Sequence, residues 1–172
     1  MKKMSHKLIA FICGLYVSGA VFALSTDKDQ PIFIEADQAE IDDQRGVTIY
    51  RGDATITQGS LKINGNVVTI HFDVNQDITK VVAEGQPAKF KQKPDGGKPN
   101  QNAEARVMEF HTNNDTIILL GDAISWQGES KISADRIVYN TLQGKVIAES
   151  LDEDGEEASS SRVSIIIAPK KK

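Results

Sequence analysis

Apolar and polar residues alternate with a period of two through most of the chain after residue 30. Alternation of this kind, rich in Val, Ile and Thr, is typical of half-buried β-strands. Turn signals recur about every eight to twelve residues, and no helical period of useful length is present after the first 23 residues. The pattern predicts an all-β fold. Its strands are expected at 32–35, 47–51, 54–58, 61–64, 68–72 and, last, Val163–Ala168, with a turn signal at Asn64-Gly65.

The alternation changes phase near one glycine. Apolar positions are odd-numbered before Gly52, as at Val47 and Ile49, and even-numbered after it, as at Ala54 and Ile56. An extra residue in one strand shifts the pleat in this way. We therefore predict a β-bulge at Gly52, repeated at Gly121, where the apolar face changes parity.

The chain also contains an internal repeat. Residues 35–70 align with residues 104–139 at an offset of 69 without a gap, and 11 of the 36 positions are identical, where average composition gives about two or three. Lys80–Glu84 resembles Lys145–Glu149 at an offset of 65. Repetition indicates one multi-strand unit used twice and stacked on a shared core. This favours an elongated scaffold over an enzyme built around a single pocket.

The first 23 residues have the pattern of a secretory signal peptide. Lys2, Lys3 and Lys7 precede an apolar run, and Val21-Phe22-Ala23 suits cleavage after Ala23. The run of 16 residues is shorter than the ~20 that a membrane span needs. A lipid-modified Cys13 is disfavoured because no small residue precedes it. We expect a signal peptide at 1–23, one β domain at 24–168 and a basic tail at 169–172.

The remaining composition excludes several kinds of protein. The only cysteine, Cys13, lies in the predicted signal peptide, so no disulfide or thiolate metal site is expected. Removing 1–23 takes away three of the 20 basic residues and none of the 24 acidic ones, which leaves a charge of −7. That charge disfavours nucleic acid and anionic membrane surfaces as partners.

Residues that would carry catalysis are scarce. His71 and His111 lack metal-binding spacing, and no nucleophile elbow, phosphate loop or dinucleotide motif is present. The carboxylates of Glu35, Asp37 and Glu40 are interpreted as a solvated cluster, and 152–157 as an acidic hairpin tip without calcium-loop spacing. Lys62 and Lys131 are interpreted as ordinary outward-facing lysines. We expect no enzyme activity, cofactor or metal.

Aliphatic residues dominate one face of strand after strand. Periodicity alone leaves open whether this face closes into a sandwich core or stays accessible to a lipid. The residues concerned are Ile32, Ile34, Ile49, Leu61, Ile63, Val68, Ile70, Leu119 and Ile137.

Several segments resemble the periplasmic lipopolysaccharide-transport proteins of the LptA (OstA-like) family. They are 29–38, 47–52, 57–64, Pro87–Gln92, Asp95–Pro99 and the second copy, 103–139; the match is weaker after residue 150. The resemblance implies a twisted, slightly open β-jellyroll of two antiparallel sheets that splay into a groove. It also implies transport of lipopolysaccharide from the inner to the outer membrane through head-to-tail stacked copies, in the periplasm.

By the same resemblance, specific residues acquire roles. The implied groove residues are Ile32, Ile34, Ile49, Leu61, Ile63, Val68, Ile70, Phe90, Phe110, Thr112 and Leu119. The implied head-to-tail interface pairs the first strand, with Ile32, Phe33 and Ile34, and the last, with Val163, Ile165 and Ile167. The implied partners are lipopolysaccharide, further copies of the chain, and inner- and outer-membrane transport components with similar jellyroll domains.

Two other functions remain open on sequence grounds. One is a periplasmic adaptor or chaperone that binds proteins by edge-strand pairing and holds no lipid. The other is a repeat-built polysaccharide-cleaving enzyme, which requires an inward-facing cluster of charged residues.

Overall fold

The computed structural model describes residues 27, 29–94, 96–140, 143, 145–151 and 162–169. The predicted signal peptide with Cys13, the acidic segment 152–157 and the lysines of the basic tail lie outside these residues. The strands are β1 (Ile32–Glu35), β2 (Gln38–Asp42), β3 (Val47–Gln58), β4 (Leu61–Phe72), β5 (Ile78–Gln92), β6 (Gln101–His111), β7 (Thr116–Gln127), β8 (Ser130–Asn140), β9 (Lys145–Glu149) and β10 (Ser164–Ile166). No helix occurs in the described part of the chain, so the all-β prediction is confirmed.

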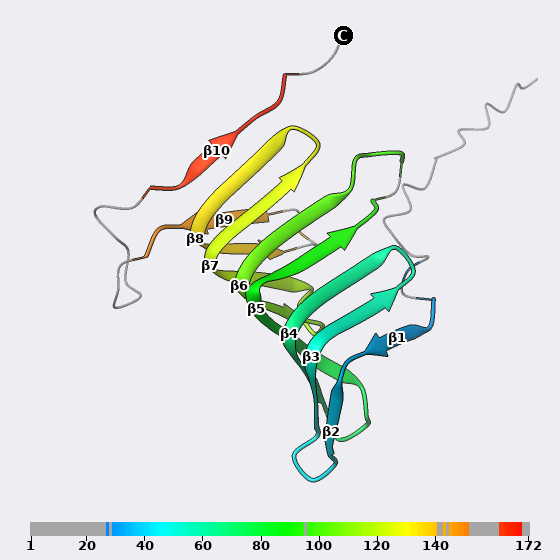
Figure 1. Ribbon diagram of the computed structural model, residues 1–172. Coiled ribbons are helices and arrows are strands. Elements are labelled where there is room, and N and C mark those ends of the chain that lie inside the picture. The colour runs from blue at the N-terminus through cyan, green and yellow to red at the C-terminus, as the bar shows by residue number, and fades with distance from the viewer. Residues whose placement is uncertain are drawn as a thin grey trace, which may run out of the picture.

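All strands belong to one antiparallel sheet, shown in Figure 1. Its hydrogen-bonded order is β1-β3-β4-β5-β6-β7-β8-β10, with β2 also on β3 and β9 also on β8. From β2 to β9, consecutive strands pair antiparallel as in a meander. Most of their connections are short turns, and β5 and β6 are joined by the longer loop 93–100. The sheet has free edges at both ends.

The edge strands show that the sheet has two halves. β1 pairs with residues 55–58 of β3, whereas β2 pairs with residues 47–51. At the other end β10 pairs with residues 131–133 of β8, whereas β9 pairs with 136–140. We call the region that contains β1 and β10 the β1/β10 half, and the region that contains β2 and β9 the β2/β9 half. The long strands β3 to β8 run through both halves.

A line of register shifts separates the halves. The hydrogen-bonding register shifts between Arg51 and Ala54 in β3 and between Glu84 and Ala88 in β5. Corresponding shifts occur in β4, β6 and β7. Bulges bend strands and increase their twist. We call this line of shifts the fold line.

Both predicted bulges are present at the fold line. Gly52 and Asp53 have φ of 79° and 43°, and Gly121 and Asp122 have φ of 75° and 50°. Glycine adopts this left-handed backbone without the steric cost that other residues incur. The Asn64-Gly65 signal, by contrast, is not a turn, because β4 runs through it. A Cβ on Gly65 would lie 2.8 Å from the Glu84 carbonyl oxygen, so this glycine permits close approach of two strands.

The predicted change of parity at Gly52 is wrong. Thr48 is buried on one side of the bulge and Ile56 on the other, both even-numbered. The change occurs instead on β4, where Ile63 faces inward as the partner of Ile56, and Val68 is fully buried. Ile49 therefore lies on the outer face. Periodicity misled because the outer face of the β2/β9 half also carries aliphatic residues beside its polar ones, with Val82 and Ile118 in the same row as Ile49.

The sequence repeat is confirmed in the strand pairing. Ile34 pairs with Ile56, and Ala103 pairs with Ser125 at the same offset of 69. Likewise Ala54 pairs with Gly65, and Ala123 with Ala134. β1 and β2 together thus occupy on β3 the place that β6 occupies on β7. Each copy contributes to both halves of the sheet.

The core lies along the fold line and is built from small residues. Ala54, Ala88 and Ala105 are fully buried there. Larger residues of both halves, among them Ile56, Val68 and Ile137, complete a single cluster. Because one cluster contains residues from both halves, their inner faces pack on each other near the bend.

Candidate functional site

The inner face of the β1/β10 half carries an aliphatic row that crosses every strand of that half. Directly paired residues share a face, and the successive pairs give Ile34, Ile56, Ile63, Phe90, Ala103, Ser125, Ile132 and Ile165. Ile56 and Ala103 are buried, whereas Ile63 and Phe90 pack on the core cluster but remain half-exposed. The row is apolar apart from the Ser125 hydroxyl.

The inner face of the β2/β9 half carries two such rows. The row beside the fold line contains Tyr50, Val68, Ala83, Met108, Leu119, Ile137 and Ala148. The next row contains Thr48, Ile70, Val81, Phe110, Ile117, Tyr139 and Val146. In the first row Val68, Ala83, Met108, Leu119 and Ile137 are buried. In the second, Phe110, Ile117 and Tyr139 are only half-buried, so accessibility rises away from the bend.

Most predicted groove residues lie on these inner faces. Ile34, Ile63, Val68, Ile70, Phe90, Phe110 and Leu119 belong to the rows above, and Ile32 and Leu61 share the face of the residues two positions further along their strands. Ile49 is the exception on the outer face. Thr112 follows β6, and its hydroxyl donates to the Ile78 carbonyl at the β5 end.

Sequence reasoning missed other inner-face residues that the repeat could have revealed. Ile132 and Tyr139 stand at an offset of 69 from Ile63 and Ile70, and Ile117 stands at that offset from Thr48. All three lie in the inner rows. Transferring the predicted Ile63 and Ile70 to the second copy would have found Ile132 and Tyr139. Ile117 corresponds to Thr48, which the predicted parity placed opposite the apolar face.

Exposed large apolar residues gather at the two ends of the sheet. At one end are Ile32 and Phe33 of β1, 44% and 64% exposed, and Ile41 of β2. At the other end are Val146, Ile147, Val163, Ile165, Ile166 and Ile167. The predicted interface residues are all in these groups except Ile34, which is half-buried. Among the described residues only Val74 is a comparably exposed apolar residue elsewhere.

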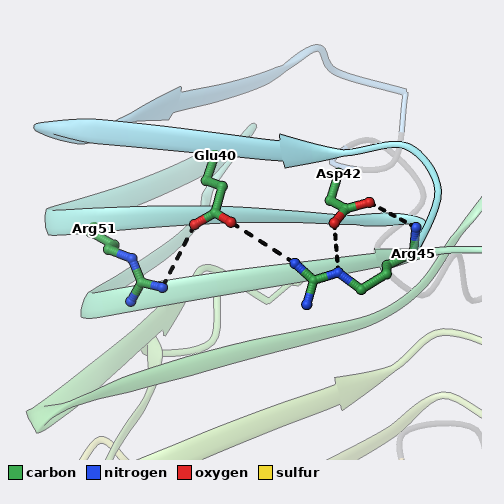
Figure 2. Close-up of polar contacts among 4 residues, drawn as sticks. All are labelled: Glu40, Asp42, Arg45 and Arg51. Carbon is green, nitrogen blue, oxygen red and sulfur yellow. Dashed lines mark hydrogen bonds and ion pairs between the residues drawn. The ribbon is translucent and has the colours of Figure 1, made fainter.

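Charged side chains line the β2 edge of the sheet, as Figure 2 shows. Arg45 donates from its backbone N–H to Asp42 Oδ1 at 2.9 Å and from Nε to Oδ2 at 2.6 Å. Glu40 lies between Arg45 and Arg51, at 3.9 and 4.0 Å. The backbone N–H of Arg45 and then its guanidinium hold the pKa of Asp42 below its usual value. The carboxylate of Glu40 is thus engaged at the surface and does not face the interior.

A buried carboxylate fastens the chain before β1 to the β3–β4 turn. Asp27 is only 8% exposed. Its oxygens accept from the Ser60 backbone N–H at 2.8 Å, the Ser60 hydroxyl at 2.7 Å and the Gln92 amide at 3.1 Å. Burial raises the pKa of Asp27, but these hydrogen bonds outweigh it, and the net direction is downward. β1 is thereby tied in register at the sheet edge.

The titratable groups do not converge on a catalytic arrangement. His71 and His111 flank Lys80 in register on the outer face, and His111 contacts Glu109 at 2.9 Å. No group of three metal-ligating side chains occurs in the described ranges. Glu35 is exposed on β1, and Asp37 lies against Gly52 at the bulge.

These features define a β-scaffold with an apolar inner face and apolar strand edges at both ends. Residues 33–145 match the family described as "LptA/(LptD N-terminal domain) LPS transport protein". The chain belongs to this family of lipopolysaccharide transport proteins.

Individual relatives agree with the family assignment. The chain is 36% identical to the lipopolysaccharide export system protein LptH of Pseudomonas aeruginosa over 155 residues, 90% of this chain and 89% of that protein. It is 35% identical to LptA of Escherichia coli K12 over 147 residues, 85% of this chain and 79% of that protein. The crystal structure of LptH, the periplasmic LptA homologue of the P. aeruginosa lipopolysaccharide transport device, superposes with a TM-score of 0.73 at 32% identity. That superposition covers 84% of this chain and 99% of the other.

Proposed function

We propose that this chain carries lipopolysaccharide through the periplasm by holding its acyl chains between the inner faces of the two halves. Exposure of hydrocarbon to water costs about 0.8 kcal/mol per methylene. A lipid with several acyl chains therefore needs an apolar cover in an aqueous compartment. The half-exposed inner rows, with Ile63, Phe90 and Ile117, have the aliphatic chemistry for that cover.

The distribution of burial is the single observation that carries this proposal. Residues at the fold line are buried. Further along the inner faces Ile56 and Ile70 are buried as well, but Ile63, Phe90 and Ile117 remain half-exposed. A closed sandwich core would also bury these residues of the inner face. The pattern supports a twisted, slightly open jellyroll in which the two halves act as two sheets and splay into a groove.

The apolar ends support head-to-tail stacking of copies. β1 and β10 each offer one unpaired backbone edge, and edges of this kind accept another strand. The first inner row begins with Ile34 on β1 and ends with Ile165 on β10, so an added copy would continue it. Inner- and outer-membrane transport components with similar domains would bind these same two ends.

A periplasmic location is supported by the proposed signal peptide and by the similarity to LptH, which is a periplasmic protein. Secretion with cleavage near Ala23 would place Asp27 close to the new N-terminus. No nucleotide-binding motif is present in the sequence, so energy for transport would come from a partner. The carrier itself would bind lipid only moderately, because tight binding would stop the flow.

Photo-crosslinking in cells tests the acyl-chain site. A photoreactive residue at Phe90 or Ile34 is expected to label lipopolysaccharide. The matched control is Thr69, on β4 in register with Ile49 and Val82 on the outer face. Equal labelling from Thr69 would contradict the proposal, and labelling of proteins alone from every site would favour the lipid-free adaptor.

A further inference from the structure

A row of lysines and one tryptophan crosses the outer face of the β1/β10 half. It lies opposite the inner row containing Ile63 and Phe90, because successive strand residues point to opposite faces. The paired residues are Phe33, Thr57, Lys62, Lys91, Asn102, Trp126, Lys131 and Ile166. Strands far apart in sequence thus place three lysines and the only tryptophan of the chain in one line.

The charges in this row are not explained by the fold. Lys62 and Lys91 are direct cross-strand partners and both exposed, an arrangement that is destabilising when like charges stand alone. Among the described residues neither of them, nor Lys131, forms an ion pair, whereas the neighbouring Lys89 pairs with Glu104 at 3.8 Å. Three unpaired ammonium groups on a chain of net negative charge suit an anionic ligand.

Trp126 adds a second kind of contact. It lies between Asn102 and Lys131 in the row and is half-buried on a face that no other described element covers. An indole face offers a flat apolar platform and its N–H a donor. Lysines for phosphate, an amide for hydroxyls and an indole for a ring together suit a phosphorylated sugar rather than inorganic phosphate.

The row lies beside the rim of the proposed groove. Lys62, Lys91, Trp126 and Lys131 are each one residue in from the end of their strand, which corresponds to about 3.3 Å along the strand. Lys93 and Lys98 lie in the adjoining β5–β6 loop. A headgroup whose acyl chains lie on the inner face would need to pass over only this short edge.

The opposite strand tips carry mixed charges. Asp43 lies in the β2–β3 turn, and Asp73 and Asp77 lie in the β4–β5 turn, at the far ends of the same strands. Arg45, Lys80 and Lys145 also lie at that end. Because carboxylates there offset the cations, a phosphorylated headgroup would be attracted more strongly to the lysine row.

We infer that Lys62, Lys91, Trp126 and Lys131 form a binding site for the phosphorylated sugar headgroup of lipopolysaccharide, outside the β1/β10 rim. This rests on the proposed function, because the acyl chains must lie on the inner face for the headgroup to reach the row. The headgroup would fold over this rim, so each lipid would have one orientation in the stack. Contact through exposed lysines would be salt-sensitive and quickly reversible, which suits a molecule in transit.

Trp126 fluorescence measures this site directly, because the mature chain has no other tryptophan. The probe is a deacylated, bis-phosphorylated glucosamine disaccharide, and the comparison is the same disaccharide without phosphates. We expect saccharide-dependent quenching or a spectral shift with the phosphorylated probe, weakened severalfold by raising salt from about 50 to about 300 mM. An equal response to both disaccharides, or no response to either, would overturn the inference.

Charge-matched variants locate the contact. Lys62→Gln with Lys91→Gln should weaken the response at least tenfold, whereas Lys80→Gln with Lys145→Gln, at the other strand tips, should change it less than twofold. Circular dichroism checks that both variants are folded. Equal weakening in the two pairs would overturn the inference, since it would reflect net charge alone.

Acyl binding is followed separately by displacement of a fluorescent fatty-acyl probe. Absence of the saccharide response from the wild-type chain, with its acyl binding intact, refutes the headgroup site and leaves the proposed function standing. Absence of acyl binding from the wild-type chain refutes the proposed function, and with it the path of the headgroup over this rim.

Discussion

At the residue scale, each of the two bulge glycines, Gly52 and Gly121, lies against a neighbouring side chain, and the two neighbours occupy the same position in the sequence repeat. A Cβ on Gly52 would lie 2.7 Å from the Asp37 Cβ, and one on Gly121 would lie 2.3 Å from Arg106 Nε. Asp37 and Arg106 stand at the offset of 69. Both bulges have a left-handed backbone that favours glycine. At Gly52 the Asp37 Cβ adds a contact that requires glycine, whereas the guanidinium of Arg106 at Gly121 lies at the end of a flexible side chain.

Gly52→Ala tests whether the close contact with Asp37 lowers stability in addition to the backbone strain of an alanine at positive φ. Gly96 has nearly the same φ, 76° against 79°, but no neighbouring heavy atom lies within 4 Å of the position that a Cβ would occupy there. We expect about 1 kcal/mol loss of stability for Gly96→Ala from backbone strain, and about 2–4 kcal/mol for Gly52→Ala once overpacking is added. Asp37→Gly should partly restore the Gly52→Ala variant. Equal denaturation midpoints for the two alanine variants would contradict this account.

Asp27 gives a prediction on pH. Because its pKa is lower in the folded chain than the usual value of about 3.9, its stabilisation is present above about pH 4 and is lost as pH falls through the folded pKa. Asp27→Asn should lower unfolding stability by about 1–2 kcal/mol at pH 7. The difference from wild type should shrink below pH 4 in urea titrations. A difference independent of pH would show that the charge of Asp27 contributes nothing.

At the element scale, the strands at the edges of the sheet differ in whether charged or apolar side chains flank their unpaired backbone. β2 carries Glu40 and Asp42, which pair with Arg45 of the β2–β3 turn and Arg51 of β3 (Figure 2). β1 and β10 instead expose Phe33 and Ile166, without flanking ion pairs among the described residues. Charged edge residues discourage strand addition, so β1 and β10 are the edges open to pairing.

Two single variants test the polarity of stacking. Phe33→Asp should block the β1 end and Ile166→Asp the β10 end, so each variant alone should stay monomeric at concentrations where wild type associates. Mixed in equal amounts they should form a dimer through the two unaltered ends, as heterologous contacts require. Sedimentation velocity measures this. Val74→Asp, at a residue 96% exposed away from both ends, is the control and should associate normally. Dimers of either single variant alone would indicate a symmetric interface instead.

At the scale of the whole molecule, one sheet provides two chemically different faces. The fold line seals the alanine-rich core, the inner rows further out stay apolar and accessible, and the outer face of the β1/β10 half carries lysines. Stacking would extend each row in parallel. An apolar track and a basic track would then run along the same assembly.

A charge placed on the inner face should abolish lipid binding without unfolding the protein. Ile63→Glu puts a carboxylate at a half-exposed inner position, where it would be desolvated by an acyl chain. We expect at least tenfold weaker binding of a fluorescent fatty-acyl probe. Thr69→Glu, on the same strand but the outer face, should bind as wild type. Equal affinities in the two variants would place the lipid elsewhere.

The sequence by itself determined the all-β class, the turn positions apart from Asn64-Gly65, the bulges at Gly52 and Gly121, the duplication and the family, because each is encoded by periodicity, glycine placement or sequence motif. It did not determine the strand bounds: the segments predicted at 47–51 and 54–58 form one strand, as do those at 61–64 and 68–72, and β2 was not predicted. It also indicated most of the aliphatic positions on the inner face. It did not determine which face is inner. The roles predicted for Ile49 and Thr48 are reversed in the structure. Aliphatic residues occur on both faces of the β2/β9 half, and only the packing of the two halves distinguishes the faces.

Tertiary structure alone decided two further things. Gly52 and Gly121 indicated the fold line on β3 and β7, but its continuation as register shifts on β5 and β6 depends on the pairing between strands. Lys62, Lys91, Trp126 and Lys131 are spread over 70 positions of sequence, and each looks like an isolated surface residue there. Cross-strand register brings them into one row, because antiparallel pairing places residues side by side according to their distance from a turn rather than their place in the chain.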